Sequence, residues 1–87
     1  MKIKNIYELK KVVNQYLVIR VEDALVLDNM ITINEIGKDI FEFLKEEHSE
    51  DEVVSYILSN YEVTEEKARE DVHEFIEKLI QKGIVEC

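Results

Sequence analysis

The stretch ITINEIGKDIFEFL, residues 31–44, is where the pattern of this sequence changes. Before it, apolar side chains tend to alternate with polar ones, which is typical of β-strands. Within and after it, apolar side chains recur every three or four positions, which is typical of amphipathic helices. The stretch therefore marks the point where a sheet is followed by helices, and it predicts an α+β fold.

The length and composition of the chain predict one small domain. A chain of 87 residues can form a single core, so we expect residues 1–87 to be one domain. No apolar run approaches the roughly 20 residues of a membrane span, and the N-terminal residues lack the features of a signal peptide. The single cysteine, Cys87, gives neither a disulfide framework nor a metal cluster. We therefore expect a cytoplasmic protein that has no cofactor and does not bind membranes.

The net charge of −9 is unevenly distributed. Residues 1–33 hold five Lys and Arg against four Asp and Glu, whereas residues 34–87 hold six against sixteen. An acidic helical half repels phosphate backbones, which argues against nucleic acid as a partner. The same charge favours solubility, and it could attract a basic patch on a partner protein.

Two strands are expected near the start of the chain. Residues 7–13 alternate loosely between apolar and polar side chains, and residues 16–21 are rich in β-branched and aromatic ones. Asn14–Gln15, between them, is expected to form a tight turn, although it lacks the glycine of a strong hairpin signal.

A third strand is expected before the helices. Glu22–Asp23 interrupts the pattern, residues 24–27 are extended again, and Asp28–Asn29 turns before a short strand over residues 30–33. One bent strand and two separate pieces both fit residues 24–33. The predicted order is three strands followed by three helices, so that helices cover one face of an antiparallel sheet and an edge strand keeps unpaired backbone groups.

The three helices are defined by their caps, because the sequence contains no proline and only two glycines. Asn34 is expected to cap the first helix, Ser49 with Glu52 forms a capping box for the second, Thr64 caps the third, and Gly83 ends it. The side chains expected to point inward are Ile36, Ile40, Phe41 or Phe43, and Leu44 in the first helix, Val53, Val54, Ile57 and Leu58 in the second, and Ala68, Val72, Phe75, Ile76, Leu79 and Ile80 in the third.

The sequence offers little sign of catalysis. His48 and His73 are far apart and are expected to be surface residues, and no metal-ligand spacing occurs. Paired carboxylates such as Glu65–Glu66 lie in first helical turns, where the helix dipole stabilises each by about 0.3–1 kcal/mol. No Ser/His/Asp grouping or glycine-rich phosphate loop is present. We therefore expect neither a catalytic nor a metal site, and we do not expect an enzyme.

One border of the third helix allows two interpretations. Asp71, Lys78 and Lys82 flank Phe75 at the margin of the apolar stripe. Charges at such a margin usually form the rim of a core. Alternatively, this border faces the open edge of the sheet and forms one side of a groove.

Three motifs resemble the PqqD-like family. The first is Ile33–Asn34–Glu35–x–Gly37–x–x–Ile40–Phe41–x–x–Leu44, which is similar to the Leu-Asn-Glu helix opening of that family. The second is the capping box and the helix that leads to Asn60–Tyr61, and the third is Asp71–Val72–x–x–Phe75–x–x–x–Leu79–x–x–x–Gly83–Ile84. The resemblance covers roughly residues 7–85, although Ile33 stands where Leu is usual and Phe41 where Trp is common.

This resemblance implies a winged-helix-like fold, with a three-stranded antiparallel sheet followed by a three-helix bundle. It also implies a recognition element that binds the leader of a ribosomally made precursor peptide and presents it to a modifying enzyme, often a radical S-adenosylmethionine enzyme. In such a complex the leader docks as an added strand between the third strand and the third helix. Carried onto this chain, the implied peptide-binding residues are Asn29, Met30, Ile31, Thr32, Ile33, Asp71, Val72, Phe75, Lys78, Leu79 and Lys82.

Two other functions remain alternatives at the level of the sequence. A winged-helix transcription regulator would need basic residues on the outer face of its recognition helix, and the third helix is mainly acidic there. A structural dimerisation module would pair its sheet edge with a second copy. The sequence is compatible with either a monomer or a weak homodimer.

Overall fold

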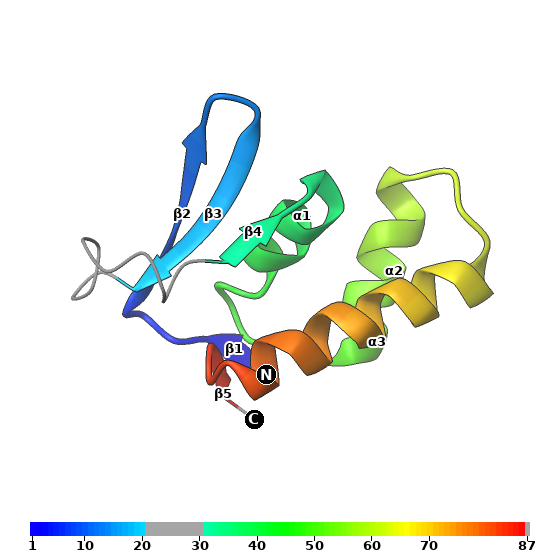
Figure 1. Ribbon diagram of the computed structural model, residues 1–87. Coiled ribbons are helices and arrows are strands. Elements are labelled where there is room, and N and C mark those ends of the chain that lie inside the picture. The colour runs from blue at the N-terminus through cyan, green and yellow to red at the C-terminus, as the bar shows by residue number, and fades with distance from the viewer. Residues whose placement is uncertain (21–30, 87) are drawn as a thin grey trace.

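The computed structural model describes residues 1–20 and 31–86, and it has the α+β architecture that the sequence predicts (Figure 1). Three antiparallel strands form one sheet in the order β2-β3-β4, and three helices follow in the chain. None of the described helices has the length and apolar character that a membrane crossing requires. The elements are β1 (Lys2–Ile3), β2 (Tyr7–Val12), β3 (Gln15–Arg20), β4 (Ile31–Ile33), α1 (Glu35–Phe43), α2 (Glu50–Asn60), α3 (Glu65–Gln81) and β5 (Val85–Glu86).

The β2–β3 hairpin turns one residue earlier than the sequence suggests. Val12 pairs with Gln15, so the turn consists of Val13 and Asn14 rather than Asn14–Gln15. Val13 has a φ of 57°, which is unusual for a β-branched residue, and its side chain is 83% exposed. Sequence reasoning misplaced the turn because valine is a poor candidate for a left-handed conformation.

The described part of the third strand agrees with the prediction. It spans Ile31–Ile33, and its buried, exposed, buried pattern matches the predicted alternation. The extended segment predicted for residues 24–27, the turn at Asp28–Asn29 and the contribution of Met30 lie outside the described residues.

The caps of all three helices confirm the predictions. The Asn34 side chain accepts a hydrogen bond of 2.8 Å from the Gly37 N–H, and Thr64 caps α3 in the same manner. Ser49 and Glu52 form both hydrogen bonds of the capping box. Gly83 has the positive φ, 71°, that the end of α3 requires. These local signals fix where each helix starts and stops.

One core lies between the sheet and the helices. Phe41, not Phe43, occupies the core position in α1. Ile80, which was expected to point inward, is 40% exposed, so that part of the prediction was wrong. It lies at the edge of the predicted stripe, where the helix turns its face toward solvent. The described side chains that form the core include Ile3, Val18, Ile31, Ile33, Ile40, Phe41, Leu44, Val53, Val54, Ile57, Ala68, Val72, Ile76, Leu79, Ile84 and Val85.

The half-buried ring of Phe43 belongs to a stack of three rings on the outside of α1 and α2. It lies between His48, with centroids 3.8 Å apart, and Tyr56, with centroids 4.3 Å apart. His48 is therefore packed against an aromatic ring and is only half exposed, whereas the sequence suggested an ordinary surface histidine.

A second, two-stranded sheet joins distant parts of the chain. β1 pairs antiparallel with β5, with Lys2 opposite Glu86 and Ile3 opposite Val85. The N–H of Ile3 also donates to the carbonyl of Leu44 at 2.8 Å. Strands of two residues have no detectable periodicity, which is why the sequence did not predict this pair.

Candidate functional site

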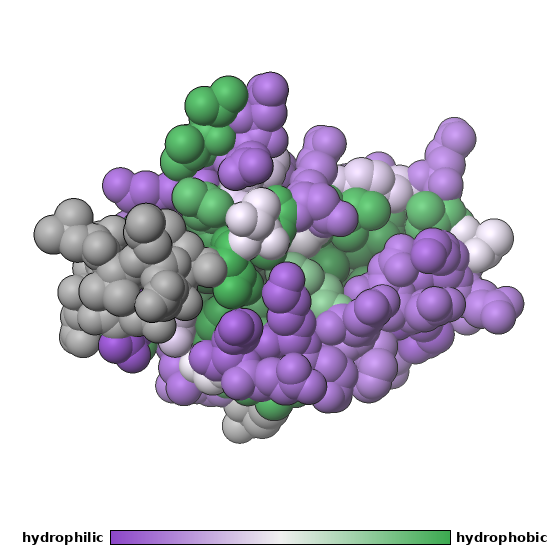
Figure 2. All heavy atoms as spheres, viewed as in Figure 1, coloured by the Kyte–Doolittle hydropathy of each residue, from purple (hydrophilic) through white to green (hydrophobic). Residues whose placement is uncertain are grey.

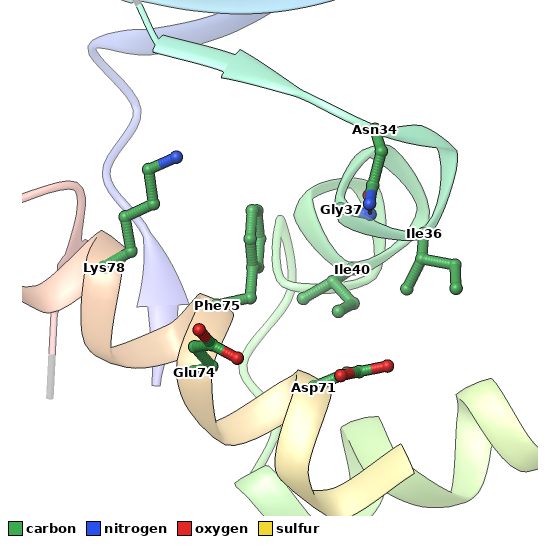
Figure 3. Close-up of a pocket in the computed structure, with 8 residues that line it drawn as sticks. All are labelled: Asn34, Ile36, Gly37, Ile40, Asp71, Glu74, Phe75 and Lys78. Carbon is green, nitrogen blue, oxygen red and sulfur yellow. Dashed lines mark hydrogen bonds between the residues drawn. The ribbon is translucent and has the colours of Figure 1, made fainter. Parts of the chain in front are cut away.

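A groove of about 300 Å³ separates the start of α1 from the middle of α3. Figure 3 shows the two helices on opposite sides of the groove, with the Phe75 ring between them. Figure 2 shows hydrophobic surface running beside the hydrophilic outer face of α3. The lining residues are Asn34, Ile36, Gly37 and Ile40 from α1 and its cap, and Asp71, Glu74, Phe75 and Lys78 from α3.

The position of the Phe75 ring depends on Gly37. A Cβ atom on Gly37 would lie only 3.0 Å from Cε1 of Phe75 and 3.1 Å from Cβ of Ile33. The absence of a side chain at Gly37 therefore allows α3 and β4 to meet α1 at one point. Phe75 is only half buried, so its ring is available on the side of the groove.

The outer edge of β4 can be analysed from the hairpin register. In a hairpin with a two-residue turn, the residues that flank the turn, here Val12 and Gln15, form a hydrogen-bonded pair. Such pairs alternate along an antiparallel ladder. The backbone groups of Gln15 therefore face β2, and those of Tyr16 and Val18 face the opposite way, toward β4.

This alternation assigns the outward-facing backbone of β4. Tyr16 pairs with Ile33 and Val18 pairs with Ile31, so these two isoleucines are hydrogen-bonded to β3. The N–H and C=O of Thr32, between them, consequently face the outer edge, and no strand in the described residues pairs with that edge. β3 lies on one side of β4 and α3 on the other (Figure 1).

The charges of the groove come from α3. Asp71 forms an ion pair with Lys67, with 3.2 Å between Nζ and Oδ1. The same contact, first through a hydrogen bond and second through the nearby negative charge, raises the pKa of Lys67. The Lys67 side chain is exposed and that of Asp71 is partly exposed, so the pair contributes little to stability and leaves the Asp71 carboxylate accessible.

A side-chain hydrogen bond joins α1 to the C-cap residue of α2. Tyr61 donates a hydrogen bond to Oδ2 of Asp39, and Nζ of Lys38 lies 2.8 Å from Oδ1. Partial burial acts to raise the pKa of Asp39, but the hydrogen bonds from Lys38 and Tyr61 outweigh it and lower that pKa overall. The hydrogen bond to Asp39, assisted by burial, raises the pKa of Tyr61 to about 12. The hydrogen bond from Tyr61 thus links α1, which forms one side of the groove, to the C-cap of α2.

A match to a protein-family model assigns the chain to a family. The model for "Coenzyme PQQ synthesis protein D (PqqD)" matches residues 16–85, which include most of β3, all of β4, all three helices and the groove. The chain belongs to the PqqD family.

Two solved structures share the fold of this PqqD-family chain. One is "TbiB1 in Complex with the TbiA(beta) Leader Peptide", with a TM-score of 0.76, 20% identity, and coverage of 99% of this chain and 95% of that one. The other is "Lasso peptide synthetase B1 complexed with the leader peptide", with a TM-score of 0.72, 17% identity, and coverage of 95% and 93%. At these identities the likeness establishes the fold. No curated protein sequence matches the chain.

The structure of this PqqD-family chain brings together only part of the predicted site. Phe75, Asp71 and Lys78 line the groove, and Ile31, Thr32 and Ile33 form β4. The side chains of Val72 and Leu79 are wholly buried in the core, and Lys82 is exposed at the C-cap of α3, outside the groove lining. Asn29 and Met30 lie outside the described residues.

Sequence reasoning did not assign the α1 side of the groove. Its lining residues, together with Glu74 of α3, were not among the predicted site residues, although most of them belong to the first family motif. A signal was available in Gly37, since a glycine in the first turn of a helix has low helix propensity and suggests close approach of another element. The full set that was missed is Asn34, Ile36, Gly37, Ile40 and Glu74.

Proposed function

We propose that this PqqD-family domain binds the leader of a ribosomally synthesised precursor peptide as an added strand along the outer edge of β4. The proposal rests on two features together: the outward-facing backbone of Thr32, which no strand within residues 1–20 and 31–86 pairs with, and the half-buried ring of Phe75 in the groove. It is supported by the two structures of similar fold, each of which contains a leader peptide.

The free energy of binding requires both the outer edge of β4 and the groove beside Phe75. Two hydrogen bonds to the Thr32 backbone contribute roughly 1–3 kcal/mol net. Micromolar binding needs about 8 kcal/mol, and ordering a flexible leader opposes binding. Apolar leader side chains, each contributing about 1.5–3 kcal/mol when fully buried, must therefore occupy the groove beside Phe75. The backbone edge sets the register, and the apolar contact supplies most of the affinity.

In this proposal the domain is a recognition module and not a catalyst. Residues 1–87 act as one unit that holds the leader while a separate enzyme, of the radical S-adenosylmethionine class or another peptide-modifying class, acts on the rest of the precursor. The domain itself needs no metal or cofactor for this role. The acidic helical half offers a surface on which a basic patch of such an enzyme could dock.

The test is a calorimetric titration with a synthetic leader from a short reading frame encoded beside this gene. We expect Phe75→Ala to weaken binding at least tenfold, because it removes the apolar contact in the groove. Ile80→Ala is the matched control, since Ile80 is a partly exposed apolar residue of the same helix that does not line the groove. Equal affinities for wild type and a folded Phe75→Ala variant would rule out this site.

A further inference from the structure

We infer that the leader segment bound in this groove carries three side chains in a fixed order at every second position: basic, apolar and acidic, from its N-terminus to its C-terminus. The basic side chain lies beside Asp71, the apolar one beside Phe75 and the acidic one beside Lys78. This inference rests on the proposed function, because it concerns the same groove and specifies which peptides the groove accepts.

The first step is the order of charges along α3. Asp71 lies four residues before Phe75 and Lys78 three residues after it, so each charge is about one helical turn from the ring. All three side chains line the groove, and Figure 3 shows the carboxylate and the ammonium group on opposite sides of the ring. A bound peptide therefore meets a negative group, an aromatic ring and a positive group in sequence.

The second step is that these charges are available. The contact of Asp71 with Lys67 is an exposed pair, which a bound cation can replace at little cost. Lys78 is exposed and forms no ion pair within residues 1–20 and 31–86. Glu74 adds a second carboxylate to the groove, so we expect the basic position to contribute more than the acidic one.

The third step is the match in length. Lys78 follows Asp71 by seven positions in the helix, which corresponds to roughly 10.5 Å along the axis of α3. In an extended peptide, side chains at positions i, i+2 and i+4 point to the same face and span about 13 Å. Long Lys and Glu side chains can bridge the small difference. Three alternating side chains of one strand therefore reach the two charges and the ring.

The fourth step concerns the direction in which the bound peptide runs relative to β4. Every strand pair in the described sheet is antiparallel, and an added strand continues such a sheet best in the antiparallel sense. Lys78 lies toward the start of β4, whereas Asp71 lies toward α1, which follows the end of β4 (Figures 1 and 3). A peptide antiparallel to β4 thus passes Asp71 first, so its basic residue precedes its acidic one.

The inference can be tested with two synthetic peptides of equal composition and charge. The forward peptide contains Lys-Thr-Leu-Thr-Glu and the reversed one Glu-Thr-Leu-Thr-Lys, each with two further threonines at both ends and blocked termini. Binding is followed by two-dimensional NMR titration, with the Thr32 amide and the Phe75 ring as reporters. We expect the forward peptide to bind roughly five- to tenfold more tightly at low salt, and this ratio to shrink at high salt.

A charge-swapped variant is the matched control. Asp71→Lys combined with Lys78→Asp keeps the net charge of the protein and should invert the preference between the two peptides. Equal binding of both peptides at the reporters would overturn the charge order and leave strand docking intact. A preference of the wild type for the reversed peptide would overturn the inferred order as well. If neither peptide shifts the Thr32 amide at millimolar concentration but the synthetic leader does, the inference fails and the proposed function stands. If the synthetic leader does not shift it either, the proposed function fails as well.

Discussion

Gly37 shows how a single residue shapes the groove. Alanine would be favoured by about 1 kcal/mol over glycine in a helix interior, so glycine at this position weakens α1. The structural reason for glycine is the close approach of the Phe75 ring and of Ile33, both within 3.2 Å of where a Cβ atom would lie. Glycine at this position therefore lowers the stability of the helix but permits the contact that positions the Phe75 ring.

We predict that Gly37→Ala weakens leader binding while it changes the stability of the fold only slightly. The new methyl group should displace the Phe75 ring, because Cβ of Ile33 is attached directly to the β4 backbone and cannot yield as easily. The gain in helix propensity should offset part of the strain. The free energy of unfolding, measured by thermal denaturation, should therefore change by less than about 1 kcal/mol. Leader affinity should fall at least threefold in the same titration. A folded variant with unchanged affinity would show that the ring position does not matter for binding.

The contact between Tyr61 and Asp39 leads to a prediction about pH. Because the pKa of Tyr61 is raised to about 12, its contribution is complete below its ordinary pKa of 10 and is lost as the pH rises toward 12. Because the pKa of Asp39 is lowered below 3.8, its contribution is complete above that value and is lost as the pH falls through the lowered pKa. The contact should therefore stabilise the fold most between about pH 5 and pH 9.

Urea unfolding of Tyr61→Phe at pH 3, 7 and 11 measures this contribution. We expect a loss of about 1–2 kcal/mol at pH 7, since the variant lacks a hydrogen bond to a charged group, and a smaller loss at the two extremes. Tyr56→Phe is the control, because the ring of Tyr56 stacks on Phe43 and its stack survives the loss of the hydroxyl. A difference that stays constant from pH 3 to pH 11 would contradict the linkage.

At the scale of elements, the two edges of β4 have different roles: the inner edge pairs with β3, and we propose that the outer edge pairs with the leader. Thr32→Pro removes only the outward N–H, so β4 should still pair with β3 through Ile31 and Ile33. We expect leader affinity to fall about tenfold, while the folded state remains populated. Thr32→Val, which keeps the N–H and the β-branched shape, should bind like the wild type. If Thr32→Pro binds normally, β4 is not the docking edge.

Elements with local signals were predictable from the sequence, and those that depend on tertiary contact were not. Asn34, Ser49 and Thr64 marked their helices because caps act within three residues. The turn at Val13 was misplaced because its conformation contradicts local preference. In the groove, Phe75 was found through its helical border, whereas the α1 side was missed because its lining depends on how α1 and α3 cross.

At the scale of the whole molecule, the excess of acidic residues favours peptide binding over DNA binding. Sixteen of the twenty acidic residues follow residue 33, so the helices carry nearly all of the net charge of −9. We expect no retarded complex in a gel-shift assay with random duplex DNA at low salt and micromolar protein, where basic domains bind most strongly. Tight binding under those conditions would favour the transcription regulator. Light scattering on the same sample distinguishes a monomer from a dimer formed through the sheet edge.

The pairing of β1 with β5 also determines how this domain can be combined with others. Lys2 lies opposite Glu86, so the chain enters and leaves the fold at neighbouring points (Figure 1). Such a geometry suits circular permutation: a short glycine-serine linker between these points, with new ends opened at the Val13–Asn14 turn, would keep every described element intact. It equally suits insertion into a surface loop of a larger enzyme, which would need to spread its own backbone by only about one strand spacing.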